Sequence, residues 1–197
     1  MKNFLEMKRQ VLAAAIGVLA LGSSMAAPVQ WTVASGGNDH WYEFVATNLT
    51  WDDARAAALA STYLGASGYL ATALDAAENT FISVTVAGGE LAWLGGTDAG
   101  SEANWYWADG PEANQALTYF NWNSGEPNNC CGGENYLQTN FGNNSGGWND
   151  HGGPGNAGQA NGYLVEYSMT NNVPEPTTLA LLFPALLAAA VVRRRRG

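Results

Sequence analysis

The segment Gly125–Tyr136 reads GEPNNCCGGENY and has almost no apolar side chains. Carboxylates, amides and glycines fill it, and the tripeptide Trp148-Asn149-Asp150 adds further amide and carboxylate oxygens. Ca²⁺ takes roughly six to eight oxygen ligands of these kinds, whereas zinc and copper prefer imidazole and thiolate. The pattern therefore predicts a calcium site; the alternative is a solvated polar loop without an ion. The predicted metal ligands are Glu126, Asn128, Glu134, Asn149 and Asp150.

Three other residue types bear on this segment. Pro127 separates two predicted ligands, and a cis Glu126–Pro127 bond would turn both flanking side chains to one side, so we predict that bond to be cis. The only two cysteines, Cys130 and Cys131, are adjacent and cannot cross-link distant strands. A vicinal ring, pairing between molecules and free thiols remain open, and an oxidising compartment favours the first two. His40 and His151 lack a partner at ligand spacing and are interpreted as ordinary polar histidines.

The sequence around this segment predicts both helices and strands. Trp41–Val45 is β-prone, and Thr50-Trp-Asp-Asp53 is a capping-box pattern that opens an alanine-rich helix through about Ala60. Thr72 with Asp75 opens a second short helix through about Ser83. Strands are predicted at Leu91–Leu94, Trp105–Trp107, Tyr136–Gln138 and Tyr163–Tyr167. Helices followed by strands indicate an α+β domain, and the long Gly/Asn-rich region Gly110–Gly162 is where we expect function.

The N-terminal segment is typical of a secretory signal peptide. Lys2, Lys8 and Arg9 precede an apolar run from Val11 to Leu21, and a small-x-small pattern follows, so residues 1–26 are predicted to be removed. The apolar run is shorter than the roughly 20 residues of a spanning helix; an uncleaved membrane anchor is the alternative.

The C-terminal segment combines Pro174-Glu175-Pro176, a short apolar stretch and the arginines 193–196. In this order the three parts of residues 171–197 resemble the PEP-CTERM sorting tail of Gram-negative bacteria. The resemblance implies a transient membrane contact, handling by the membrane enzyme exosortase, and a place at the cell surface or in its extracellular matrix. A permanent transmembrane anchor at this end is the alternative.

Charge and length narrow the function classes. From Ala27 to Val173 the only basic side chain is Arg55, against fifteen carboxylates, a formal charge of −14. Nucleic acids and anionic membranes would be repelled, while a cation would be attracted. The length of residues 27–170 suits one domain with a sizeable core.

An ordered set of motifs resembles the C-type lectin domain over about residues 40–168. The set comprises Glu126-Pro127-Asn128, Glu134, Trp148–Asp150, Trp51–Ala58, Gly68–Thr72, Ala92–Gly95, Trp105–Gly110, Phe120–Trp122 and Gly162–Tyr167. The resemblance implies a fold of two helices, short antiparallel sheets and a long calcium-binding loop region. It also implies that Trp93, Trp107, Trp122 and Trp148 build the core.

The resemblance implies a specific function for the loop. Glu126, Asn128, Glu134 and Asn149 would hold calcium and contact vicinal hydroxyls of a glycan, and the sequence Glu-Pro-Asn goes with mannose- or glucose-type sugars. An auxiliary calcium site would use Asp98, Glu102, Asn129 and Asn135 together with Glu134. The expected function is an exported, calcium-dependent mannose-type lectin.

Two points depart from that expectation or compete with it. Tyr136 and Val165 stand where the family usually has cysteines. An adhesive or protein-binding module on the same fold, without sugar binding, is the alternative function. An enzyme is not expected, since the carboxylates would serve as a glycosidase pair only if calcium did not engage them.

Overall fold

The computed structural model describes residues 27–143, 146–153, 158 and 160–169. The predicted signal peptide and the predicted sorting tail both lie outside these ranges. No helix within them is long and apolar enough to cross a membrane.

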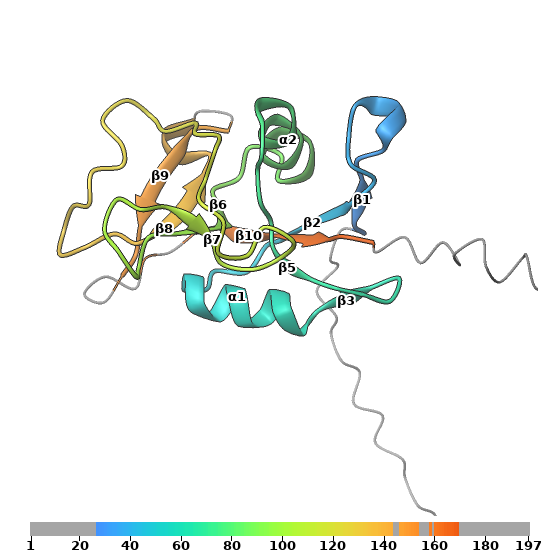
Figure 1. The fold of residues 1–197 in the computed structure, drawn as a ribbon, viewed down its shortest axis with the longest axis horizontal. Helices are drawn as coiled ribbons and strands as arrows, with labels where there is room; N and C mark the ends of the chain where they lie inside the picture. Colours follow the sequence, from blue (N-terminus) through green and yellow to red (C-terminus); the bar gives the residue numbers. More distant parts are fainter. Residues whose placement is uncertain (1–26, 144–145, 154–157, 159, 170–197) are drawn as a thin grey trace, which may run out of the picture.

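The described chain forms ten strands and two α-helices (Figure 1). The strands are β1 (Val29–Gln30), β2 (Trp41–Val45), β3 (Thr62–Tyr63), β4 (Ala66–Ser67), β5 (Tyr69–Leu70), β6 (Ala92–Thr97), β7 (Tyr106–Trp107), β8 (Tyr136–Thr139), β9 (Trp148–His151) and β10 (Gly162–Tyr167). The helices are α1 (Trp51–Ala60) and α2 (Ala76–Thr80), and α2 continues into a π-helical segment at Phe81–Val86; short 3-10 turns occupy Val33–Ser35 and Phe141–Asn143.

Eight strands make one sheet whose main path runs β1-β2-β10-β6-β8-β9. β5 pairs with β10, β7 pairs with β6, and β3 and β4 form a separate hairpin. Most pairs are antiparallel, but β6 and β10 run parallel, with Gly162 opposite Ala92. The sheet is therefore mixed rather than antiparallel throughout, because the chain crosses from β6 through the loop region before it returns as β10.

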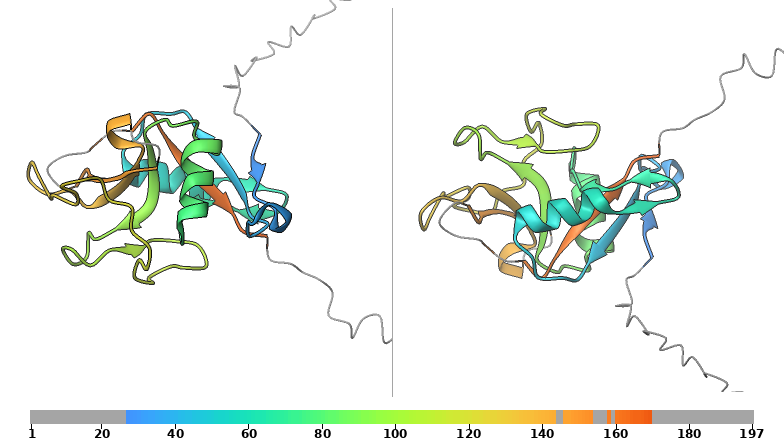
Figure 2. Two further views of the ribbon diagram at one scale, coloured as in Figure 1. Left: turned by 90° about the horizontal axis from the view of Figure 1, so that it is seen from above. Right: turned by 90° about the horizontal axis from the view of Figure 1, so that it is seen from below.

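The two helices cover opposite faces of this sheet, as the views from above and below show (Figure 2). α1 buries Trp51, Ala54 and Ala58 in a cluster on one face, and Ile82 in the π-helical segment lies in the cluster on the other face. Strand β10 alternates between the two: Val165 packs in the α1 cluster and Leu164 in the other. The domain thus has two apolar layers around one sheet.

The first helix begins and ends where the sequence predicts. The Thr50 side chain accepts a hydrogen bond from the Asp53 amide at 3.2 Å, and the helix ends at Ala60 before an extended Ser61. The second helix differs in detail. Asp75 caps it by accepting from the Ala77 and Glu78 amides, and the helical backbone continues to Val86, beyond the predicted end.

Thr72 does not open the second helix, contrary to the prediction. Its amide and hydroxyl both donate to the buried Glu166 carboxylate at 3.1 Å. The strands predicted from local pattern are present, with β6 two residues longer than expected and β7 one residue shorter. β9 was not predicted.

The tryptophan prediction is largely confirmed. Trp93, Trp107 and Trp148 are fully buried. Trp122 is only half-buried, yet its ring packs edge-on against Trp105 and Trp148 at centroid distances of 4.9 and 5.7 Å.

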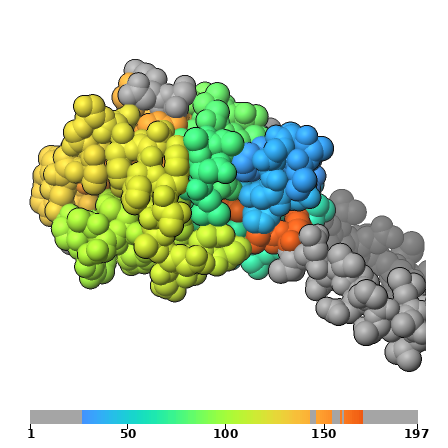
Figure 3. Space-filling model, turned by 45° about the horizontal axis from the view of Figure 1, so that its top comes forward, coloured from blue at the N-terminus to red at the C-terminus, as the bar shows by residue number. Residues whose placement is uncertain are grey.

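The loop region forms one end of the molecule. In the space-filling view the yellow and orange segments, including Gly125–Tyr136, make up the end opposite the blue N-terminal segment (Figure 3). β1 and the C-terminal end of β10, near the two ends of the described domain, lie on the side of the molecule away from that loop (Figure 1).

Candidate functional site

Asp150 on β9 fixes the start of the Gly125–Tyr136 loop. Its two carboxylate oxygens accept hydrogen bonds from the amides of Asn128 at 3.0 Å and Asn129 at 2.7 Å. β9 pairs with β8, where Asp150 lies opposite Leu137, so the side chain is buried and held in register. The Glu126–Pro127 bond is cis, as predicted.

Glu134 and Asn128 meet at one backbone amide. The Cys130 N–H donates to Asn128 Oδ1 at 2.9 Å and to Glu134 Oε2 at 3.1 Å. The other Glu134 oxygen lies 3.0 Å from His151 Nδ1, and the Glu134 amide donates to Asn129 Oδ1 at 2.8 Å. The loop therefore closes on itself around the side chains that the sequence singled out.

Glu126 completes a group of three carboxylates. Desolvation by burial, followed by the neighbouring carboxylates of Asp150 and Glu134, raises the pKa of Glu126. Among the described side chains, Glu126 Oε2 is a buried oxygen without a hydrogen-bond partner. A buried carboxylate beside like charges is costly unless a proton or a cation compensates for its charge.

The residues present fit a calcium ion. No three acidic, imidazole or thiolate side chains within the described ranges are arranged to hold a metal by themselves. Amide oxygens would have to complete the set, and those of Asn128 and Asn149 lie in the same two segments. One contact departs from a ligand arrangement: Asn149 Nδ2 donates to the Asp150 carbonyl oxygen at 2.6 Å. Calcium bound by the Asn149 side-chain oxygen and the Asp150 carbonyl oxygen would replace this hydrogen bond.

Cys130 and Cys131 form a disulfide with each other. Of the three open alternatives, the structure contains the vicinal ring. It lies in the loop between Asn128 and Glu134, with Cys131 exposed and Cys130 half-buried.

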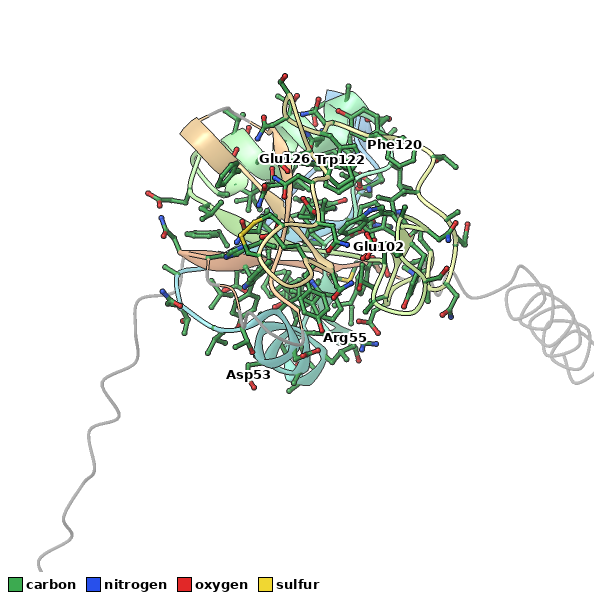
Figure 4. All side chains as sticks on the ribbon, turned by 90° about the vertical axis from the view of Figure 1, so that its left-hand side faces the viewer. Asp53, Arg55, Glu102, Phe120, Trp122 and Glu126 are labelled. Carbon is green, nitrogen blue, oxygen red and sulfur yellow. A yellow bond between two sulfur atoms is a disulfide. The ribbon has the colours of Figure 1, made fainter. Side chains whose placement is uncertain are left out.

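The residues of the predicted auxiliary site also lie near one another. Asn135 Nδ2 donates to Asp98 Oδ1 at 3.2 Å, and Asp98 Oδ2 accepts from the Ala103 amide at 2.8 Å. Desolvation and the charges of Asp98 and Asp150 raise the pKa of the exposed Glu102. In the side view Glu102 lies apart from Glu126 (Figure 4). Each Asp98 oxygen has a protein donor, so the need for a cation is weaker here than at Glu126.

Sequence reasoning missed His151. The sequence predicts an ordinary polar histidine without a partner; in the structure its ring lies beside Glu134 and stacks on Trp93 at a centroid distance of 6.1 Å. Its position directly after Asp150, on the same sheet edge, was the available signal. His40, by contrast, is half-buried and pairs with the buried Glu166, whose Oε1 lies 2.6 Å from His40 Nδ1.

Comparison with known proteins agrees with this geometry. The model of the Lectin C-type domain matches residues 47–153, which include both helices and all the predicted ligands. The chain belongs to the C-type lectin domain family. This family consists of carbohydrate-binding domains that are typically not enzymes, in agreement with the sequence prediction.

Individual C-type lectin relatives place the match in context. The chain is 36% identical over 137 residues to halomucin of Haloquadratum walsbyi, covering 65% of this chain and 1% of halomucin. The chain spans about half the length of two further curated relatives: 50% of ladderlectin from Oncorhynchus mykiss and 57% of lectin BRA-3 from Megabalanus rosa. The C-type lectin CEL-I from Cucumaria echinata superposes with a TM-score of 0.56 at 27% identity, covering 67% of this chain and 92% of that one.

A second solved structure was obtained with a sugar. The cow CD23 carbohydrate-recognition domain, in the presence of a GlcNAc2Man3 oligosaccharide, superposes with a TM-score of 0.55 at 27% identity. The alignment covers 68% of this chain and 92% of the CD23 chain.

Proposed function

We propose that this C-type lectin domain is an exported, calcium-dependent lectin for sugars of the mannose or glucose type. The observation that carries the proposal is the unpartnered buried oxygen on Glu126, beside the carboxylate charges of Asp150 and Glu134 that raise the pKa of Glu126. Asn128 and Asn149 would supply the remaining side-chain oxygens. Calcium, when bound, would polarise two vicinal hydroxyls of the sugar.

The side chains of the loop would orient that sugar. A carboxylate only accepts hydrogen bonds, whereas an amide both donates and accepts. Glu126 and Asn128 flank Pro127, so one hydroxyl would donate to the carboxylate and accept from the amide nitrogen. The order of acid and amide, which resembles that of mannose-type family members, would thus set the sugar preference. Glu134 and Asn149 would serve the second hydroxyl in the same way.

Export and surface display belong to the same proposal. The predicted signal peptide at residues 1–26 and the sorting tail at residues 171–197 would bring the domain to the cell surface or matrix of a Gram-negative bacterium. An auxiliary calcium ion at Asp98, Glu102, Asn129 and Asn135, with Glu134, would be held more weakly, because two amides contribute in place of carboxylates. A single site would bind a monosaccharide with a Kd near ~1 mM, so display of many copies would supply affinity.

Calorimetric calcium titration followed by addition of methyl mannoside tests the proposal. We expect calcium binding by the wild type, then a sugar signal that disappears in chelator. Glu126→Gln should lose both, while Asp53→Asn, which also removes one carboxylate but lies on α1 far from Glu126 (Figure 4), should retain both. Calcium binding without any sugar signal would instead favour an adhesive module, and equal behaviour of both variants would refute the assigned site.

A further inference from the structure

We propose that the Cys130–Cys131 disulfide is a thiol-exchange site that controls the calcium loop: its reduction by a dithiol releases the side chains of Asn128 and Glu134 and weakens calcium binding. This inference rests on the proposed function. Two observations carry it: the location of the disulfide between two predicted ligands, and the double hydrogen bond that the Cys130 amide makes.

The Cys130 amide is the point at which the two ligand side chains are joined. It donates to Asn128 Oδ1 at 2.9 Å and to Glu134 Oε2 at 3.1 Å. The orientation of this N–H therefore decides where both oxygens lie. A ring closed between Cys130 and Cys131 restricts the backbone on the C-terminal side of that amide.

Outside the disulfide, hydrogen bonds hold the two ends of the segment: the Asn129 amide donates to Asp150, the Glu134 amide to Asn129 Oδ1, and the Gly133 amide to the Cys130 carbonyl. The backbone between them has a conformation that only the closed ring favours. Of the five residues between Asn128 and Glu134, four have positive φ: Asn129 at 47°, Cys131 at 60°, Gly132 at 108° and Gly133 at 115°. Non-glycine residues seldom adopt this region, and the two glycines leave many other conformations open to the reduced chain. No neighbouring group within 4 Å of the Cβ position of Gly132 confines the loop there. Without the ring, the segment would populate conformations in which Asn128 and Glu134 no longer share a donor.

The disulfide is accessible to a reductant. Cys131 is exposed and Cys130 half-buried, so a small dithiol can attack a sulfur directly. One thiolate of the reagent attacks and breaks the S–S bond to form a mixed disulfide; its second thiol then displaces the protein sulfur. The two electrons pass to the protein, which gains two thiols and two protons, and the reagent leaves as a cyclic disulfide.

The experiment compares oxidised protein with protein reduced by dithiothreitol and freed of it by gel filtration under argon. Because the chain has only these two cysteines, any change arises at this site. We expect the Kd for calcium to rise about tenfold on reduction and to return on reoxidation. The Cys130→Ser/Cys131→Ser variant should bind calcium like the reduced wild type and ignore the reductant.

A second readout does not depend on calcium. In chelator, hydrogen exchange at the Cys130 amide should accelerate at least tenfold on reduction, while the Ala54 amide in α1, bonded to the Thr50 carbonyl, should stay unchanged. Equal calcium Kd values and equal exchange in the two redox states would overturn the inference. If neither state binds calcium, the proposed function fails, and the exchange rates alone decide whether the disulfide positions the loop.

Discussion

At the residue scale, the buried carboxylate of Glu78 gives the fold a pH dependence. It accepts from the Tyr42 hydroxyl at 2.6 Å and from the Leu74 amide at 2.8 Å. Desolvation, with the nearby charge of Glu166, raises its pKa to about 7. The folded protein therefore binds a proton at Glu78 that the unfolded chain releases above its ordinary value of 4.5, and stability falls as pH rises from about 4.5 to 7.

His40 acts in the same direction. Its hydrogen bond to Glu166 raises its pKa above the ordinary 6.5, against the opposing effect of burial, and the charges of Glu166, Glu78 and Glu112 add to the rise. The stability that His40 contributes is complete below its ordinary pKa and is lost as pH rises through the raised value. Both groups therefore favour mildly acidic conditions.

We predict that the free energy of unfolding, measured by urea denaturation in chelator, decreases between pH 5 and pH 8. The Glu78 contribution is at most about 3 kcal/mol, from about 1.4 kcal/mol per pKa unit. Glu78→Gln should flatten the profile, whereas Glu90→Gln, the same change at an exposed position, should leave it as in the wild type. A wild-type profile that rises over this range would contradict the assignment.

The sugar preference is also a residue-scale property. Exchanging the acid and amide, Glu126→Gln with Asn128→Asp, reverses which flanking side chain can donate a hydrogen bond. From the family resemblance, we expect competition by methyl galactoside to exceed that by methyl mannoside in this variant, in the reverse of the wild-type order. Unchanged order in both proteins would remove the Glu-Pro-Asn assignment, and Asp53→Asn serves as the control.

At the element scale, Tyr136 attaches α1 to the sheet. Its ring stacks on Trp51 at a centroid distance of 4.4 Å and an interplanar angle of 4°. Tyr136 stands where the family usually has a cysteine, so an aromatic contact has taken that place. Val165, at the second such position, is buried in the same cluster.

Tyr136→Ala should therefore lower the free energy of unfolding by about 2–3 kcal/mol, through loss of buried ring area and stacking. Tyr136→Phe keeps the ring and removes only the hydroxyl, which contacts Asp52 at 3.3 Å near the surface, so its effect should be under ~0.5 kcal/mol. Thermal and denaturant unfolding of both variants provide the measurement. Similar losses in the two would show that the hydroxyl, and not the stack, matters.

The elements also show what the sequence could predict. Helix α1 has its own cap at Thr50 and its own alanines, so local signals suffice to place it. β9 could not be found this way, because Trp148-Asn149-Asp150-His151 is polar and becomes a strand only by pairing with β8. The parallel contact of β6 with β10 joins residues about 70 positions apart and has no local signal either.

In the candidate site, too, some residues can be predicted from local sequence and others depend on the folded structure. Glu126, Asn128 and Glu134 share one short segment whose composition indicates their role. The contact of His151 with Glu134 depends on the position of β9 beside the loop. The two hydrogen bonds that the Cys130 amide donates depend on the conformation of the loop. Neither can be read from residue order.

At the scale of the whole molecule, calcium should couple to stability. The segment from Ala27 to Val173 carries a formal charge of −14, and the charges of Asp150 and Glu134 act on Glu126 in the loop. A ligand that binds only the folded state at about 100 times its Kd adds about 2.7 kcal/mol. We expect the melting temperature to rise by roughly 5–10 °C in excess calcium and to return with chelator.

Glu126→Gln supplies the control for that measurement, since its melting temperature should respond little to calcium. Magnesium at the same concentration separates specific binding from screening of the negative charge. An equal rise with both cations would point to screening alone.

The placement of the domain ends has a practical and a biological meaning. Because β1 and the C-terminal end of β10 both lie on the side away from the Gly125–Tyr136 loop, a tether at either end of the domain would hold the loop pointing outward (Figure 1). Neighbouring copies on a surface would then form a brush of outward-facing domains. Their binding to a polymer would depend on the surface density of the domain rather than on the orientation of any one copy. A sensor chip carrying the domain by its C-terminal end should reproduce that brush, and its retention of a mannose polymer should increase steeply with loading.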